Sequence, residues 1–132
     1  GPTLRNAPMF GRPGHAYVYL SHGVWHCMNA VAKSAGTPAG AVLLRGAEPV
    51  DGVGEEMRLA GPGLFCRALG LTTAHSGLDL VRSSLTIREA PAVPPGRVGR
   101  SPRIGLSTGH TVGRAWRFYV RGSPGVSRSA RT

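Results

Sequence analysis

The chain has 132 residues, of which 16 are Lys or Arg and 6 are Asp or Glu, so its formal net charge is +10. This length fits one domain, and a hydrophobic content of 41% supports a folded core and argues against wholesale disorder. No apolar run approaches the ~18 residues of a membrane span, and two cysteines make neither a disulfide framework nor, alone, a metal site.

The basic residues are almost all of one type. Fifteen of the 16 are arginine, and Lys33 is the exception. A guanidinium group donates to phosphate oxygens and stacks on nucleobases, so this composition predicts a polyanionic partner such as nucleic acid. A coding bias toward Arg, Gly, Ala and Pro would give the same composition, and charge alone leaves that alternative open.

The first part of the chain is expected to form a β-hairpin. Residues 1–13 are rich in Gly and Pro, which predicts a loop. The aromatic residues Tyr17 and Tyr19 then alternate with aliphatic ones, which is typical of a strand. We therefore predict two strands within residues 15–32, joined by the tight connection Ser21-His22-Gly23.

The middle of the chain is expected to add a strand and two helical stretches. Residues 41–47 alternate as a third strand, with Leu43 and Arg45 on one face. Residues 54–59 have a helix-like pattern. Residues 64–69 fit a short helix that a proline opens near its first turn and a glycine stops.

The last part is expected to be mostly loop. Residues 84–89 alternate as a strand, residues 90–102 form a Pro/Gly/Arg loop, and residues 116–121 form the last strand. Residues 127–132 are predicted to be a frayed tail. The whole of residues 1–132 is then a single compact α+β domain with a mainly antiparallel, curved sheet and a few short helices.

The hairpin holds the first candidate site. Tyr17 and Tyr19 offer rings for stacking on bases, and a stacked base contributes about 1–3 kcal/mol per aromatic residue. Asn29 offers a paired donor and acceptor that can read a base edge. The alternative is that Tyr17 and Trp25 fill the core, which is as common for aromatic residues in a strand.

Arginines hold the second candidate site. Arg45 lies among apolar residues, where a charge costs free energy unless it is paired or serves a ligand. From the sequence alone, an ion pair with a neighbour such as Glu48 is the favoured interpretation. Further arginines are expected to include a phosphate-contacting face: Arg97, Arg100, Arg103, Arg117, Arg121, Arg128 and Arg131.

Other chemistry has little support in the sequence. His22, His26 and Cys27 are close together, but no carboxylate or second cysteine joins them, so no metal or other cofactor is expected. A Gly-x-Ser-x-Gly elbow and a P-loop are both absent. Hydrolysis needs a general base, and none of the six carboxylates lies in the aromatic segment.

Taken together, several segments resemble the alkyladenine (3-methyladenine) DNA glycosylase family. They occur in the family's order and span nearly the whole chain. The segments are Arg5-Asn6 with Met9-Phe10; Tyr17-Val18-Tyr19 with His22-Gly23 and Cys27-Met28-Asn29; Val42 to Arg45 with Glu48-Pro49; Gly61-Pro62-Gly63; and Arg117 to Pro124.

The resemblance implies the family's fold and a DNA-repair activity. Such enzymes flip an alkylated or deaminated purine, of the 3-methyladenine or hypoxanthine type, out of duplex DNA and hydrolyse its N-glycosidic bond in base excision repair. By resemblance, Tyr19 stacks on the flipped base and Asn29 excludes guanine. Arg45 positions the attacking water, and the backbone carbonyl of Ile104 contacts that water.

The resemblance also implies DNA contacts and a setting. Met9 matches an apolar contact at the DNA, and His22 occupies the place of a tyrosine that wedges into the minor groove, with Trp25 beside it. The expected partner is double-stranded DNA containing damaged purines, with no membrane and no cofactor. We expect an intracellular, DNA-associated monomer, in the cytoplasm or nucleoid if bacterial.

The chain departs from the family pattern in three places. His22 is smaller and more polar than the usual tyrosine, and Leu64 stands where a basic residue is common. The family's general-base Glu comes from a segment before Arg5-Asn6 that this chain does not contain, so we expect an N-terminally truncated member. Such a chain would be inactive alone, or would be a noncatalytic, basic DNA-binding module.

Overall fold

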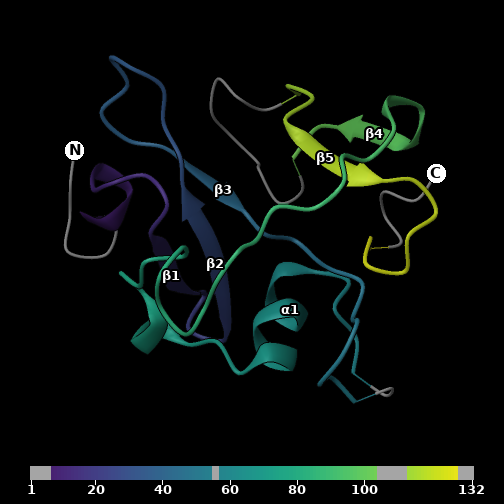
Figure 1. Cartoon of the computed structure of the whole chain (residues 1–132), viewed down its shortest axis with the longest axis horizontal. Coiled ribbons are helices and arrows are strands. Elements are labelled where there is room, and N and C mark those ends of the chain that lie inside the picture. Colours follow the sequence, from purple (N-terminus) through teal and green to yellow (C-terminus); the bar gives the residue numbers. More distant parts are fainter. Residues whose placement is uncertain (1–6, 55–56, 104–112, 128–132) are drawn as a thin grey trace.

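The computed structural model describes residues 7–54, 57–103 and 113–127. These residues form two antiparallel sheets, one α-helix and three short 3₁₀ helices (Figure 1). The predicted α+β class with antiparallel sheets and few helices is confirmed. The elements are η1 (Ala7–Phe10), β1 (Ala16–Ser21), β2 (Trp25–Val31), β3 (Ala41–Leu43), α1 (Pro62–Leu69), η2 (Thr73–His75), η3 (Pro95–Arg97), β4 (Val98–Ser101) and β5 (Arg117–Val120).

The predicted hairpin is strands β1 and β2. They pair in register from Ala16 opposite Ala30 to Ser21 opposite Trp25. His22 and Gly23 both have positive φ, 51° and 69°, and the Val24 N–H donates to the Ser21 carbonyl at 3.0 Å. Two successive positive φ values are the type I′ geometry that matches the twist of paired strands.

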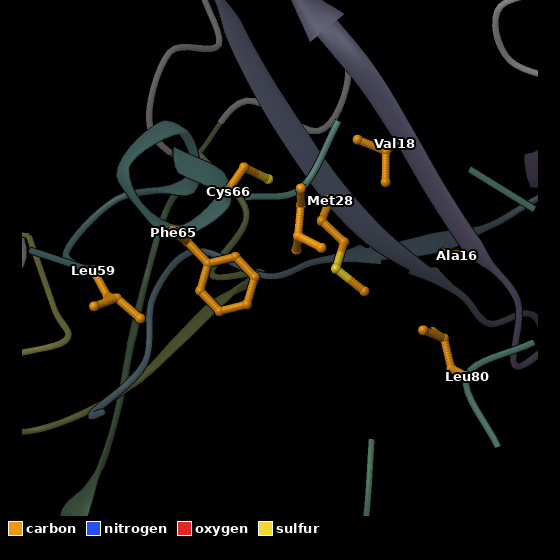
Figure 2. Packing of buried hydrophobic residues seen from close by; sticks show 8 residues of the cluster. Ala16, Val18, Met28, Leu59, Phe65, Cys66 and Leu80 are labelled. Atoms are coloured by element: carbon orange, nitrogen blue, oxygen red, sulfur yellow. The ribbon is translucent and has the colours of Figure 1, made fainter. Parts of the chain in front are cut away.

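One face of the three-stranded sheet carries the core. Ala16, Val18 and Met28 point to this face, and α1 packs across it against β2. Figure 2 shows the apolar side chains of α1 and the following loops gathered on these strands. The buried cluster comprises Ala16, Val18, Met28, Leu59, Phe65, Cys66, Leu71 and Leu80.

Helix α1 forms where the sequence predicts a helix. Pro62 occupies its first turn, where a missing N–H costs nothing. Gly70 follows the last residue with a left-handed φ of 67°, and its N–H donates to the carbonyl of Arg67. The helix turns Phe65 and Cys66 inward. None of the described helices is long and apolar enough to cross a membrane.

Cys66 yields a test of the core. Its side chain is 1% exposed, and burial raises the pKa of the thiol to about 11 because the apolar surroundings disfavour the thiolate. Since the thiolate is the reactive form, we expect alkylation of Cys66 at pH 8 to be about a hundredfold slower in the folded protein than in guanidinium. Peptide mass spectrometry after timed iodoacetamide treatment measures both rates. Equal rates would show that the core around α1 is open.

Three predicted elements are wrong. The described part of residues 54–59 is not helical, because Leu59 and Ala60 run extended beside Gly46 and Ala47. Residues 84–89 form no strand; Ile87 donates to Leu80, but no neighbouring strand pairs with the segment. Residues 90–102, expected to be a loop, contain η3 and strand β4.

The two sheets are separate in the structure. Strands β1, β2 and β3 form one sheet, in which β3 is an edge, and β4 pairs only with β5. In Figure 1 the two-stranded ribbon lies beyond β3, on the side away from β1. Arg5-Asn6, Ile104 and the predicted tail after Ser127 lie outside the described residues.

Candidate functional site

A cavity of about 1380 Å³ is lined by residues from both sheets. Tyr17, Tyr19, Asn29 and Leu43 line it, and strand alternation places these four on the sheet face opposite the core. Arg45, two residues after the end of β3, also lines the cavity. The three-stranded sheet therefore separates the apolar core from the cavity that holds the predicted site residues.

Two tyrosines lie next to each other on this face. The ring centroids of Tyr17 and Tyr19 are 5.3 Å apart, with 36° between the ring planes. Tyr17 is 6% exposed, so its ring is covered, but it lies on the cavity face and is not part of the buried core cluster. Tyr19 is only half-buried, which leaves part of its ring accessible from the cavity.

Asn29 is a buried amide at the back of the cavity. It is 7% exposed, and it lies opposite Tyr17 in the pairing of β1 with β2. Its Nδ2 donates to the Tyr17 carbonyl at 3.2 Å. This bond fixes the orientation of the amide, because a carbonyl can only accept. The side chain thus presents a fixed polar group to whatever enters the cavity.

The expected ion pair between Arg45 and Glu48 is absent. Among the described residues the sole ion pair joins Arg82 to Asp79, and Arg45 makes no hydrogen bond with any of them. Burial lowers the pKa of Arg45, and the positive charges of Arg117 and Arg103 lower it further. Arg45 is therefore a desolvated cation that faces the cavity without a counterion from the described residues.

Arg117 is the second buried cation at the cavity. It is 4% exposed, and its two Nη atoms donate to the hydroxyls of Ser101 and Ser127, each at 3.3 Å. Its guanidinium lies 5.0 Å from the centroid of the Tyr119 ring. Burial lowers the pKa of Arg117. The prediction of a phosphate-contacting face that includes Arg117 is wrong for this residue, whose side chain points inward.

The turn of the hairpin carries the predicted wedge. His22 is exposed at the tip, and its left-handed φ fixes the direction of its side chain. Trp25 is 42% exposed, so it is not a core residue, and its ring covers Gly63 at the start of α1 so closely that a Cβ there would lie 2.6 Å from it. Met9 lines the cavity, and Ile104 lies outside the described residues.

Residues outside the predicted base pocket and catalytic set also line the cavity. Glu48 is the one acidic side chain among its described lining residues, and Trp116 and Phe118 come from the ribbon. Strand alternation could not place Glu48, because it follows β3 in an irregular segment. Within the described part of the chain, no three His, Cys, Asp or Glu side chains gather to hold a metal ion.

Comparison with known proteins assigns the class of protein that this fold and cavity belong to. The family model for methylpurine-DNA glycosylase matches residues 1–124. A protein of Anaeromyxobacter dehalogenans (strain 2CP-1 / ATCC BAA-258), named "Putative 3-methyladenine DNA glycosylase", is 49% identical over 130 residues, which are 97% of this chain and 60% of the relative.

Relatives with the same name occur in other bacteria. The Chlorobaculum tepidum protein is 41% identical over 139 residues, covering 98% of this chain and 65% of the relative. The Myxococcus xanthus protein is 44% identical over 129 residues, covering 97% and 66%. The chain belongs to the methylpurine-DNA glycosylase family, and it spans 60% to 66% of the length of these relatives.

Proposed function

We propose that this chain is the base-binding part of a DNA glycosylase that removes 3-methyladenine and related damaged purines, including hypoxanthine, from duplex DNA. The observation that carries the proposal is that Tyr19 of β1, Asn29 of β2 and Arg45, two residues after β3, line a single cavity. They supply a stacking ring, a fixed polar group and a desolvated cation. Family membership supports the same reaction class.

The proposed binding step begins with extrusion of the damaged base. A base whose pairing is already weakened costs less to flip, so the lesion itself favours entry into the cavity. Tyr19 then stacks on the base. Asn29, held by its bond to the Tyr17 carbonyl, excludes guanine because the exocyclic amino group would clash with the amide.

His22 takes the place of the extruded base in this proposal. The side chain stands at the tip of a hairpin whose turn is fixed by two positive φ values, so it projects as a short wedge. Imidazole stacks on neighbouring base pairs, but it covers less area than a phenol ring. We therefore expect a weaker plug than a tyrosine would give at this position.

The proposed hydrolytic step needs a water molecule and a base to activate it. Arg45 is suited to hold the water, because its guanidinium is half-buried in the cavity and makes no hydrogen bond with the described residues. The family's general-base Glu is not among the residues of this chain, and Glu48 is the one described carboxylate at the cavity. We therefore expect this chain alone to bind lesions and to excise little.

A noncatalytic DNA-binding module is the second candidate. The observation in its favour is that neither Arg45 nor Arg117 forms an ion pair with a described carboxylate, although both line the cavity. These two cations favour binding of an anionic partner. They do not by themselves supply hydrolytic chemistry. Both candidates predict DNA binding with little excision by this chain, and they differ in whether binding prefers a damaged duplex.

The purified chain can separate the two candidates. We expect fluorescence anisotropy to show tighter binding to a hypoxanthine-containing duplex than to an undamaged one, with affinity falling by orders of magnitude between about 50 and about 200 mM salt. Alkaline cleavage of the same duplex detects abasic sites, and we expect few.

The control for catalysis is Glu48→Gln. Excision that disappears in this variant would make Glu48 the general base and this chain an enzyme by itself. Absence of excision with lesion preference retained is the result that we expect for the base-binding part of a glycosylase. Equal affinity for damaged and undamaged duplexes would contradict the proposed function.

A further inference from the structure

The ribbon β4–β5 exposes two large aromatic side chains. Phe118 is 60% exposed and Trp116 is 49% exposed. Alternation along β5 places Phe118 on one face and Arg117 and Tyr119 on the other, and Trp116 comes directly before the strand. The second face is internal, because Arg117 is buried and Tyr119 packs directly on Gly99. Trp116 and Phe118 therefore lie on an outer surface.

An arginine lies over each of these rings. Arg100 is opposite Phe118 in the strand register, and its Cζ is 4.8 Å from the ring centroid. Its Nε and Nη2 both donate to the Ala115 carbonyl, at 3.2 and 3.0 Å, which holds the guanidinium in place. The Cζ of Arg114 is 5.3 Å from the centroid of Trp116. We call Arg100, Arg114, Trp116 and Phe118 the ribbon face.

The segment of the chain that forms the ribbon carries charge of one sign. The sequence contains no Asp or Glu after Glu89, whereas the same stretch contains eight arginines. Exposed Arg97 is the last residue of η3 and exposed Arg121 follows β5, and the two flank the ribbon at one end. A like-charged surface of this kind repels a second copy of the chain and attracts a polyanion.

We propose that the ribbon face binds a single-stranded stretch of nucleic acid, with bases stacked on Phe118 and Trp116 and phosphates held by the arginines. Stacking requires an open base face, which a paired duplex hides and a single strand presents. Trp116 and Phe118 also line the cavity, so the ribbon face is continuous with the candidate site. Binding here requires no excision and does not depend on the proposed function.

The test is binding of a fluorescein-labelled oligothymidylate by the full chain. We expect salt-sensitive binding that weakens roughly tenfold in Phe118→Leu, which keeps an apolar side chain and removes the ring. Phe118→Tyr keeps the ring and should restore affinity. Arg100→Gln should weaken binding more than Arg82→Gln, which removes the same charge at an exposed position paired with Asp79.

A second readout reports stacking directly. The chain has two tryptophans, so in a Trp25→Phe background Trp116 is the sole source of tryptophan fluorescence. We expect the oligonucleotide to quench it. Circular dichroism confirms that each variant is folded. Unchanged affinity in Phe118→Leu, or binding without quenching, would overturn the inference. Sedimentation that shows self-association through Phe118 with unchanged DNA affinity would assign the face to a second copy instead.

The outcomes are separable from those of the proposed function. Loss of single-strand binding in Phe118→Leu with lesion preference retained supports the ribbon face as a distinct surface. Loss of lesion preference in a cavity variant, with oligothymidylate binding unchanged, would leave the inference intact. That result would bear only on the role of the cavity. Loss of both activities in Phe118→Leu with the fold intact would mean that the ring serves lesion binding in the cavity and not a separate single-strand site, which overturns the inference.

Discussion

Replacing Gly46 by alanine is expected to destabilise the protein by about 3 kcal/mol, which is a large fraction of the stability of a small domain. A Cβ at this position would overlap the carbonyl oxygen of Gly125 and lie 2.6 Å from that of Leu59. Both are backbone atoms, which cannot move aside as the end of a side chain can. Gly46 bridges to Ala60, so relief would require separating whole segments.

The same close contact supports the cavity. Gly125 approaches Ala47 equally closely, with 2.6 Å from its ideal Cβ position to the Ala47 carbonyl oxygen. Gly46, Ala47 and Gly125 all line the cavity, and Arg45 precedes Gly46 in the chain. A bulkier residue at Gly46 would therefore displace Arg45 as well as destabilise the fold.

Chemical denaturation followed by circular dichroism measures this effect, and Gly96→Ala is the matched control. No atom lies within 4 Å of a Cβ at Gly96, and its φ is not left-handed, so alanine there should be neutral or slightly stabilising. A Gly46→Ala protein as stable as Gly96→Ala would contradict the close packing of these backbone segments.

Local patterns predicted the elements that local residues determine. The hairpin follows from alternation and from a turn sequence that accepts positive φ, and α1 follows from the proline and glycine at its ends. These predictions required no knowledge of distant parts of the chain.

The failures involve pairing between distant residues. Strand β4 contains Gly99, which weakens a strand by itself, yet this glycine is needed because the Tyr119 ring occupies the space of a Cβ. Residues 84–89 have strand-like alternation but no partner, and Ile87 remains 50% exposed. Whether a segment pairs depends on tertiary neighbours, which override its own propensity.

Local sequence patterns also failed to predict the interactions of the charged residues at the site. Glu48 is close to Arg45 in sequence, which favoured an ion pair, but the two do not pair in the structure. Arg117 looked like a surface arginine because the hydroxyls that hold it, Ser101 and Ser127, are 16 and 10 residues away. Closeness in sequence thus predicted an ion pair for Arg45 that does not form. Distance in sequence hid the hydroxyl partners of buried Arg117.

Replacing Tyr19 by alanine is expected to remove most of the preference for damaged DNA. Stacking on one ring contributes about 1–3 kcal/mol, so affinity for a hypoxanthine duplex should fall roughly tenfold to a hundredfold. Affinity for undamaged duplex should change little, because the exposed arginines that contact phosphates are intact. Competition anisotropy with the two duplexes measures the ratio of affinities in a single experiment.

Two further variants make the result specific to the ring and to the cavity. Tyr19→Phe keeps the ring and should keep the preference, whereas a role for the hydroxyl would show as a loss in this variant too. Leu20→Ala changes the next residue of β1, which is 40% exposed and points to the other face of the sheet, so it should bind as the parent does. If Leu20→Ala and Tyr19→Ala lose preference equally, the effect belongs to the strand and not to a stacked base. A loss confined to Tyr19→Ala would instead tie lesion recognition to one ring that borders the cavity beside Asn29 and Arg45.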